Sequence, residues 1–204
     1  MTPILHEDPV SGNCYKIRLT AALTGQSIER VAYDIRRGET RTPEFLARIN
    51  PDGRIPVLQL GDRFLPESNA ACWWLADGSA LVPDDRFARA EVLRWLFWEQ
   101  YSHEPNIATL RFWRHIIGEG ALSDTQRAAI PGKQAVGQAA LALMDRHLAT
   151  REWFVGDAPT LADVAIYAYT HLAGQGGFTL ADYPAVQRWL ARMPAVPGYL
   201  PMEA

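Results

Sequence analysis

The dipeptide Glu67-Ser68 stands where a loop is predicted to enter a helix, a position that suits the binding of an anion. The first backbone amides of a helix have no partner within it, and the positive end of the helix dipole attracts a negative group such as a carboxylate. A serine hydroxyl can donate to the same group. The two residues therefore predict either a carboxylate site or a plain helix cap at Ser68 beside a surface glutamate.

The cysteines and histidines indicate neither dithiol nor metal chemistry. Cys14 and Cys72 are far apart and form no Cys-x-x-Cys pair, which fits a reducing compartment and argues against a dithiol redox centre. The histidines do not cluster with cysteines at metal-ligand spacing. We therefore expect no metal.

The segment that ends with Glu67-Ser68 alternates between strand-like and helix-like runs in the order βαβαββα. Gly61-Asp62 suits a tight hairpin turn between two short strands, and Ser68 is expected to cap the last helix. The expected strands are 4–6, 28–34, 56–60 and 63–65, and the expected helices are 13–23, 43–49 and 68–75.

A connector rich in Gly, Pro and Asp at 76–85 leads into a second segment with no convincing strand. Apolar residues recur at helical spacing over 87–112 and 133–148, and Pro131-Gly132 is expected to interrupt or start a helix. Thr160-Leu-Ala-Asp163 is a capping box, which stabilises a helix start. The sequence thus predicts one domain over 1–77 and an all-helical domain over 86–204.

Composition and charge exclude several classes of partner. Hydrophobic residues make up 48% of the 204 residues, which is ample for a packed interior. The net charge of -3 comes from scattered residues without a basic run that could follow a phosphate backbone, so nucleic acid is not expected. The start lacks a signal-peptide pattern, and no stretch approaches the roughly 20 apolar residues of a spanning helix. We therefore expect a soluble, cytoplasmic protein without a membrane partner.

The run Asn50-Pro-Asp-Gly-Arg-Ile-Pro56-Val-Leu, followed by Pro66-Glu67-Ser68, resembles the glutathione transferase family. Family sequences read Asn-Pro-x-Gly-Lys-Val-Pro-x-Leu, then Glu-Ser, and later a capping box. Each motif alone is common, but their order and spacing carry the resemblance. It implies a fold of class α/β plus all-α, with a thioredoxin-like N-terminal domain, a helical-bundle C-terminal domain, and glutathione as co-substrate.

The resemblance implies a glutathione site on Arg54, Ile55, Pro56, Glu67 and Ser68. A cis peptide bond at Ile55-Pro56 would turn the backbone of Ile55 toward the tripeptide, which would pair with it like an added strand. Ser68 would donate to the γ-glutamyl carboxylate, while Glu67 would attract the γ-glutamyl ammonium. Arg54 replaces the usual Lys and could either steady the glycyl carboxylate or stay solvated.

Transfer chemistry requires the thiol as a thiolate, and a free thiol with a pKa of about 8.5 must be stabilised by donors near the first helix. The resemblance places Ser11 at the position of the catalytic serine of theta-like and zeta-like members. Asn13 stands where bacterial nu-like members carry an asparagine. We expect Ser11 to be the principal donor, with Asn13 supporting it. Cys14 lies beside the catalytic cysteine position of other classes and is interpreted as a packing residue.

The helix that begins the second domain carries the candidates for the pocket of the second substrate. Large rings are mixed there with a few polar groups, among them Tyr101, His103 and Arg111, and such a mixture could line an apolar pocket. The alternative is that these side chains fill the bundle core or a dimer contact. Nothing in the sequence identifies the electrophile.

The function implied by the resemblance is a glutathione transferase whose bound thiolate attacks a small electrophile or a disulfide. Disulfide reductase and peroxidase activities remain open. The alternative is a non-catalytic glutathione-binding or regulatory protein on the same fold, as in the stringent-starvation, elongation-factor and yeast prion relatives. The resemblance also implies a homodimer.

Overall fold

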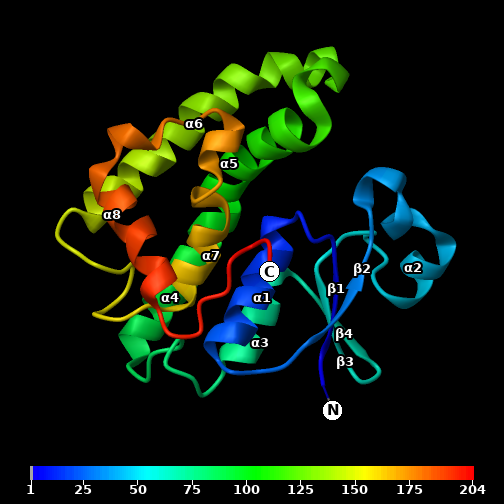
Figure 1. Cartoon of the computed structure of the whole chain (residues 1–204), viewed down its shortest axis with the longest axis horizontal. Coiled ribbons are helices and arrows are strands. Elements are labelled where there is room, and N and C mark those ends of the chain that lie inside the picture. Colours follow the sequence, from blue (N-terminus) through cyan, green and yellow to red (C-terminus); the bar gives the residue numbers. More distant parts are fainter. Residues whose placement is uncertain (1) are drawn as a thin grey trace. The chain divides into compact units, whose positions relative to one another are not determined.

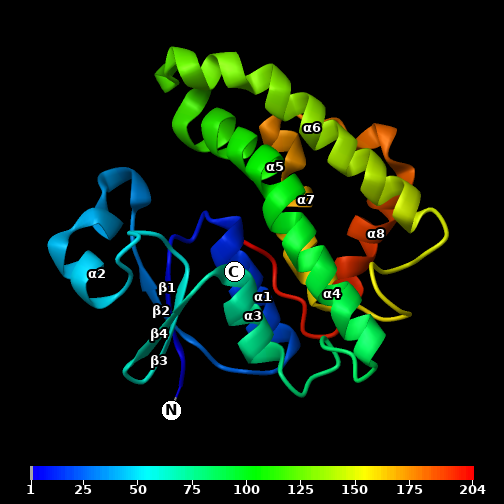
Figure 2. The same ribbon diagram turned by 180° about the vertical axis from the view of Figure 1, so that it is seen from behind.

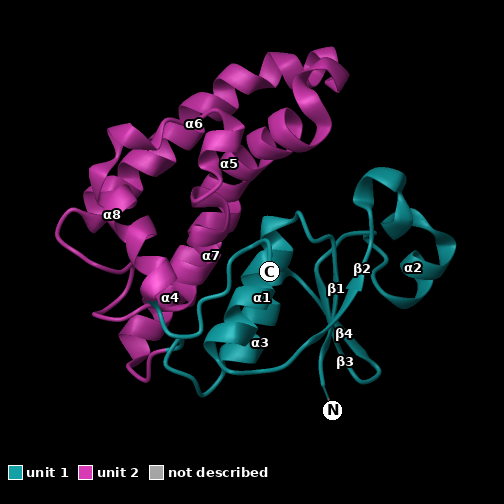
Figure 3. Ribbon diagram, in the orientation of Figure 1, with its two compact units in different colours: residues 1–82, 196–204 teal, residues 83–195 magenta. Residues whose placement is uncertain are grey.

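A computed structural model describes residues 2–204, which divide into two units (Figures 1 and 3). The first unit contains the residues up to Val82 together with Val196–Ala204, and the second contains Pro83–Ala195. Val196–Ala204 falls within the all-helical domain predicted from the sequence, but in the structure it packs with the first unit. No helix of residues 2–204 has the length and apolarity needed to span a membrane.

A four-stranded mixed sheet in the order β2-β1-β3-β4 forms the centre of the first unit. β1 pairs in parallel with β2 and antiparallel with β3, and β3 pairs antiparallel with β4. The parallel pair of β1 and β2 requires a crossover connection, which α1 provides. The antiparallel pair of β3 and β4 needs only a tight turn at Gly61. The strands are β1 (Ile4–Glu7), β2 (Glu29–Ala32), β3 (Val57–Leu60) and β4 (Arg63–Pro66).

Helices cover both faces of this sheet, as the two opposite views show (Figures 1 and 2). α1 (Gly12–Leu23) and α3 (Ser68–Ala76) lie side by side on one face, and α2 (Pro43–Arg48) lies on the other. Because side chains alternate along a strand, successive residues of β1 face different helices. The order βαβαββα and the thioredoxin-like architecture predicted from the sequence are confirmed.

The C-terminal segment is bound to α1 through a buried cluster of charged and polar groups. The Tyr15 hydroxyl donates to the carbonyl of Leu200 at 2.7 Å, and Arg18 Nη1 donates to the carbonyl of Ala204 at 3.0 Å. Arg18 also lies 3.3 Å from the carboxylate of Glu7, and both side chains are buried. Burial lowers the pKa of Arg18, while the charge of Glu7 opposes that change. Three segments distant in sequence therefore share one buried cation.

The second unit contains helices only, apart from its turns, among the residues described. They are α4 (Arg86–Trp98), α5 (Glu104–Arg111), α6 (Asp124–Leu148), α7 (Leu161–Thr170) and α8 (Pro184–Arg192). A wide π turn over Glu99–His103 joins α4 to α5, and a second one, Phe112–Gly118, follows α5. The first π turn immediately precedes the start of α5, where Pro105 has no amide hydrogen to donate to the preceding turn.

The prediction for Pro131-Gly132 is wrong, because α6 continues through both residues. This helix begins at a capping box of Ser123 and Gln126 that the sequence analysis missed. Pro131 is exposed, so the carbonyl that would have accepted its missing amide hydrogen can be hydrated at the helix surface.

The predicted capping box at the start of α7 is confirmed. Asp163 Oδ2 accepts from the Thr160 amide at 2.9 Å, and Oδ1 accepts from the Phe154 amide at 3.1 Å and from Trp189 Nε1 at 2.9 Å. Burial raises the pKa of Asp163 to about 6, although these donors act to lower it. The carboxylate thus connects α7 to α8 and to the segment before α7, beyond its local role as a cap.

Replacing Arg18 by Met is expected to lower the free energy of unfolding by about 3 kcal/mol, because Glu7 would lose its buried counter-ion and keep only the partly exposed Arg30. Urea denaturation of the whole chain measures the change. Arg48→Met is the matched control, since Arg48 and its partner Glu44 are both exposed, and it should leave stability unchanged. Equal midpoints for the two variants would contradict the role of the buried cluster.

Candidate functional site

The candidate site lies where the first turns of α1 and α3 meet in the first unit. The Ser68 hydroxyl donates to Asn13 Oδ1 at 3.2 Å. Asn13 belongs to the first turn of α1, and Ser68 is the first residue of α3. The structure therefore brings together one residue from each of the two sets predicted from the sequence.

Ser11 is the N-cap of α1, where its Oγ accepts from the amide of Cys14 at 3.4 Å. This bond uses an oxygen lone pair, so the hydroxyl proton can be donated to a different group. Ser11 is half-buried at the helix N-terminus, where the positive dipole end favours an anion. Capping and donation to a ligand are therefore compatible at this residue.

Cys14 is fully buried behind this turn. Burial raises the pKa of its thiol to about 12, although the hydrogen bond to Ser11 acts in the opposite direction. A thiol with such a pKa carries almost no thiolate at neutral pH and is a weak nucleophile. The structure agrees with the interpretation of Cys14 as a packing residue.

Glu67, not Ser68, is the N-cap of α3, so the prediction that Ser68 caps this helix is wrong. The backbone of Glu67 has φ 71°, a left-handed value that no other non-glycine residue among those described adopts. Such a conformation costs about 1–3 kcal/mol in a residue with a Cβ atom and often marks a functional position. It leaves the Glu67 side chain exposed and Ser68 buried.

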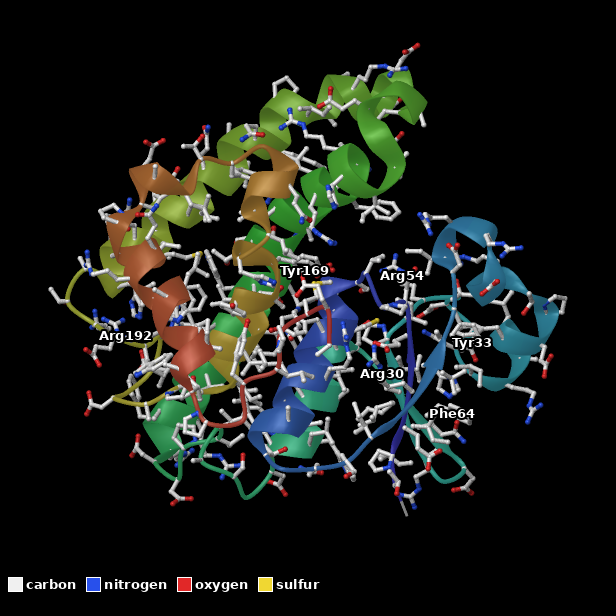
Figure 4. The ribbon with its side chains drawn as sticks, viewed as in Figure 1. Arg30, Tyr33, Arg54, Phe64, Tyr169 and Arg192 are labelled. Carbon is white, nitrogen blue, oxygen red and sulfur yellow. The ribbon has the colours of Figure 1, made fainter. Side chains whose placement is uncertain are left out.

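The Ile55-Pro56 peptide bond is cis, as predicted. Ile55 lies just before β3 and outside the strand pairing of the described sheet, while Pro56 is buried. The preceding loop is fixed by buried Asn50, whose Nδ2 donates to the carbonyl of Arg54 at 3.0 Å. Arg54 itself is exposed, and Figure 4 labels it.

Gly53 and Arg41 contribute to the same loop in a way that the sequence analysis did not foresee. Gly53 has φ 61°, and a Cβ atom there would lie 2.9 Å from the carbonyl oxygen of Thr40. Arg41 Nη1 donates to the carbonyl of Asp52 at 2.9 Å. The Asn-Pro-x-Gly motif therefore shapes the loop through its buried residues Asn50 and Gly53, while the bond from Arg41 is exposed. The motif was the sequence signal for this loop.

The three candidates for the second-substrate pocket lie in different environments of the second unit. The Tyr101 side chain is 87% exposed. His103 is fully buried and lies 2.9 Å from Thr170 Oγ1, and Arg111 Nε donates to Gln175 Oε1 at 2.7 Å. The structure does not place these three in one pocket of this unit, and their assignment stays a prediction.

The four-stranded mixed sheet with its cis proline, together with the helical second unit, defines the fold class of the glutathione transferases. Residues 10–77 match the family model of the glutathione S-transferase N-terminal domain, and residues 127–192 match that of the C-terminal domain. The chain belongs to the glutathione S-transferase family.

Individual relatives support the same assignment over nearly the whole length. Glutathione S-transferase 3 of Zea mays is 31% identical, with 98% of this chain and 92% of that protein covered. A possible glutathione S-transferase from Rhodopseudomonas palustris has a similar structure, with a TM-score of 0.94, 43% identity, and coverage of 100% of this chain and 91% of the other. A glutathione S-transferase structure from Pseudomonas fluorescens has a TM-score of 0.93 and 42% sequence identity, and the match covers 100% of both chains.

Both thiols are expected to be unreactive toward an aromatic disulfide reagent in the native protein at pH 8, because Cys14 and Cys72 are buried. Addition of urea should expose two titratable thiols per chain, as the sequence contains two cysteines. Modification of Cys14 before unfolding, located by peptide mass mapping, would contradict its interpretation as a packing residue.

Proposed function

We propose that this protein is a glutathione transferase of the Ser/Asn type, theta-like or nu-like, that activates the glutathione thiol at the N-terminus of α1. The observation that carries the proposal is the hydrogen bond between Ser68 and Asn13, which joins the proposed anchor of the γ-glutamyl group to a proposed thiol donor. Glutathione supplies the nucleophile, and the protein supplies position and charge stabilisation.

Binding is assigned to the first turn of α3 and to the loop before β3. The Ser68 backbone amide donates to the γ-glutamyl carboxylate, while the Ser68 hydroxyl keeps its bond to Asn13 Oδ1. The dipole of α3 further attracts the carboxylate. The exposed carboxylate of Glu67 attracts the γ-glutamyl ammonium. The backbone of Ile55, next to cis Pro56, pairs with the cysteinyl part of the tripeptide, and Arg54 steadies the glycyl carboxylate.

Thiol activation is assigned to Ser11 and Asn13. The Ser11 hydroxyl donates its proton to the sulfur while its oxygen keeps the bond from Cys14. Asn13 presents Oδ1 to Ser68, so its amide NH₂ group is directed to the other side. The thiol proton leaves to water, and the thiolate then forms a bond to an electrophilic carbon while the leaving group departs with the bonding electrons.

Two relatives suggest alternative activities on the same fold. A disulfide-bond oxidoreductase of Escherichia coli is 28% identical over 91% of this chain, so the electrophile could instead be a disulfide sulfur. Elongation factor 1-gamma of Prunus avium is 30% identical over 93% of this chain, which leaves a non-catalytic role as the second candidate. The proposed thiol donors Ser11 and Asn13 favour catalysis over binding alone.

Replacing Ser11 by Ala is expected to lower kcat by about 10- to 100-fold, because a hydrogen bond to a charged sulfur would be lost. The ultraviolet absorbance of bound thiolate should decrease in parallel at neutral pH. Turnover is measured with an aryl chloride and, separately, with a mixed disulfide of glutathione. The control is Ser11→Thr, which keeps the hydroxyl and the cap and should retain most of the activity.

The outcomes of this experiment separate the candidates. Unchanged turnover and absorbance in Ser11→Ala would show that Ser11 does not activate the thiol. Glutathione binding by the parent chain without turnover on either substrate would favour the non-catalytic role. Absence of glutathione binding in calorimetry would overturn the proposal as a whole.

We also propose that the chain forms a homodimer through the outer side of α4. Phe87 and Phe97 are 73% and 71% exposed, and with Leu93 they form an apolar stripe within about a third of the circumference of α4, at about 100° per residue. Tyr101, in the π turn after α4, is also exposed. A stripe of this kind on a chain of this size is typical of an interface. Contact with a second copy of the chain would bury these aromatic rings, which are exposed in the single chain.

Replacing Phe97 by Glu is expected to convert the dimer to a monomer, because the charge would be buried without a partner in the interface. Light scattering after size-exclusion chromatography gives the mass directly. The control is Val136→Glu. Val136 is exposed on α6 and lies far along the sequence from this stripe, so the measured mass should stay unchanged. A dimer that survives Phe97→Glu would place the interface elsewhere.

A further inference from the structure

A cavity of about 340 Å³ lies on the face of the sheet covered by α2, and it shares no residue with the candidate glutathione site. Its size lies at the lower end of the range for small-molecule sites in proteins. The strand register places His6, Gln59 and Phe64 on this face, since residues paired or two apart along the strands share a side. The loop after β2 adds Tyr33, and α2 adds Phe45.

Aromatic rings form much of the wall of this cavity. The rings of Tyr33 and Phe45 meet edge to face with centroids 5.0 Å apart. The rings of His6 and Phe64 are tilted at 41°, with centroids 6.0 Å apart. Figure 4 labels Tyr33 and Phe64 on the side of the sheet where α2 lies. Such walls favour a planar aromatic molecule.

A chain of hydrogen bonds determines whether the Tyr33 hydroxyl in the wall donates or accepts. Gln59 Nε2 donates to the carbonyl of Gly61 at 2.8 Å, so Gln59 Oε1 is the atom that faces His6 Nε2, also at 2.8 Å. A carbonyl oxygen only accepts, so the tautomer that fits this contact carries its proton on Nε2. His6 Nδ1 is then an acceptor, and the Tyr33 hydroxyl donates to it at 3.0 Å.

The Tyr33 oxygen consequently meets any ligand as an acceptor, because its only proton is engaged with His6. Burial, reinforced by the negative charge of Glu44, raises the pKa of Tyr33, so the hydroxyl keeps that proton at neutral pH. Glu44 also lines the cavity, where its exposed carboxylate pairs with Arg48 at 3.2 Å. A ligand that binds to the Tyr33 oxygen must therefore carry a hydrogen-bond donor.

We propose that this cavity is a second ligand site, independent of glutathione, which binds a neutral planar aromatic molecule carrying an N–H donor. The ring of the ligand packs against Phe45 and Phe64, and its N–H group donates to the Tyr33 oxygen. The chain His6, Gln59, Gly61 orients that oxygen and is itself satisfied without the ligand. Recognition thus depends on the ring and on one hydrogen bond.

Indole and N-methylindole form the matched pair of probes, because they differ in the N–H group and the methyl group adds apolar surface. Each is titrated into the whole protein with saturating glutathione present, with backbone amide shifts followed by NMR. We expect indole to bind about fivefold more tightly, as the loss of one buried hydrogen bond requires. Shifts should be largest in α2 and in β3 and β4.

Tyr33→Phe is expected to abolish the difference between the two probes, because the acceptor is removed while the ring stays. Tyr183→Phe, which deletes the same atom from the second unit, should preserve the difference. If Tyr33→Phe fails to fold, Phe64→Leu serves instead and should weaken both probes equally. Retention of the preference in Tyr33→Phe would overturn the assignment of the acceptor.

Two other results would contradict the proposal. N-methylindole binding at least as tightly as indole would mark the cavity as purely apolar. Tighter binding of naphthalene-2-sulfonate, lost in Arg48→Met, would show that the site selects an anion at its rim. The titrations with saturating glutathione test whether indole binds away from the proposed glutathione site. Repeating them without glutathione tests indole binding by itself, so a failure of the proposed function would not change the result for indole.

Discussion

The hydrogen bond from Ser68 to Asn13 is the contact on which the candidate site depends. It holds the N-terminal ends of α1 and α3 together, so the free amides and positive dipole ends of two helices serve one region. The contact is possible because both helices lie on the same face of the sheet. A single polar bond between two helix starts thus brings the two proposed anion-binding positions into one region.

The conformation of the loops next to this contact is set by constraints that lie away from the ligand. Glu67 adopts a left-handed backbone, and the cis bond before Pro56 places Ile55 outside the strand ladder. Asn50 and Arg41 fix the loop before β3 by bonds to backbone carbonyls. Because these contacts lie within the protein, they restrict the freedom of the loop, and such restriction lowers the cost of ordering it on binding.

The sheet separates two environments that can bind different chemistry. One face is closed by α1 and α3 and leads to the polar helix starts, whereas the other face is covered by the short helix α2 and retains a cavity. Alternation along β1 makes this possible, since Leu5 is buried on one side while His6 takes part in hydrogen bonds on the other. Helices on both faces therefore leave room for the proposed glutathione site and the proposed second ligand site in one small unit.

The sequence by itself determined the order of strands and helices in the first unit, the helical nature of the second, the capping box of α7 and the family. These features follow from local periodicity and from motifs whose residues are near neighbours in the chain. The tertiary structure decided which residue caps α3, the continuation of α6 through Pro131, the return of residues 196–204 to the first unit, and the burial of His103 and Arg111. Each of these depends on contacts between distant segments or on exposure to water, such as the bond from Arg18 to Ala204, and a linear pattern does not encode which distant atoms will meet.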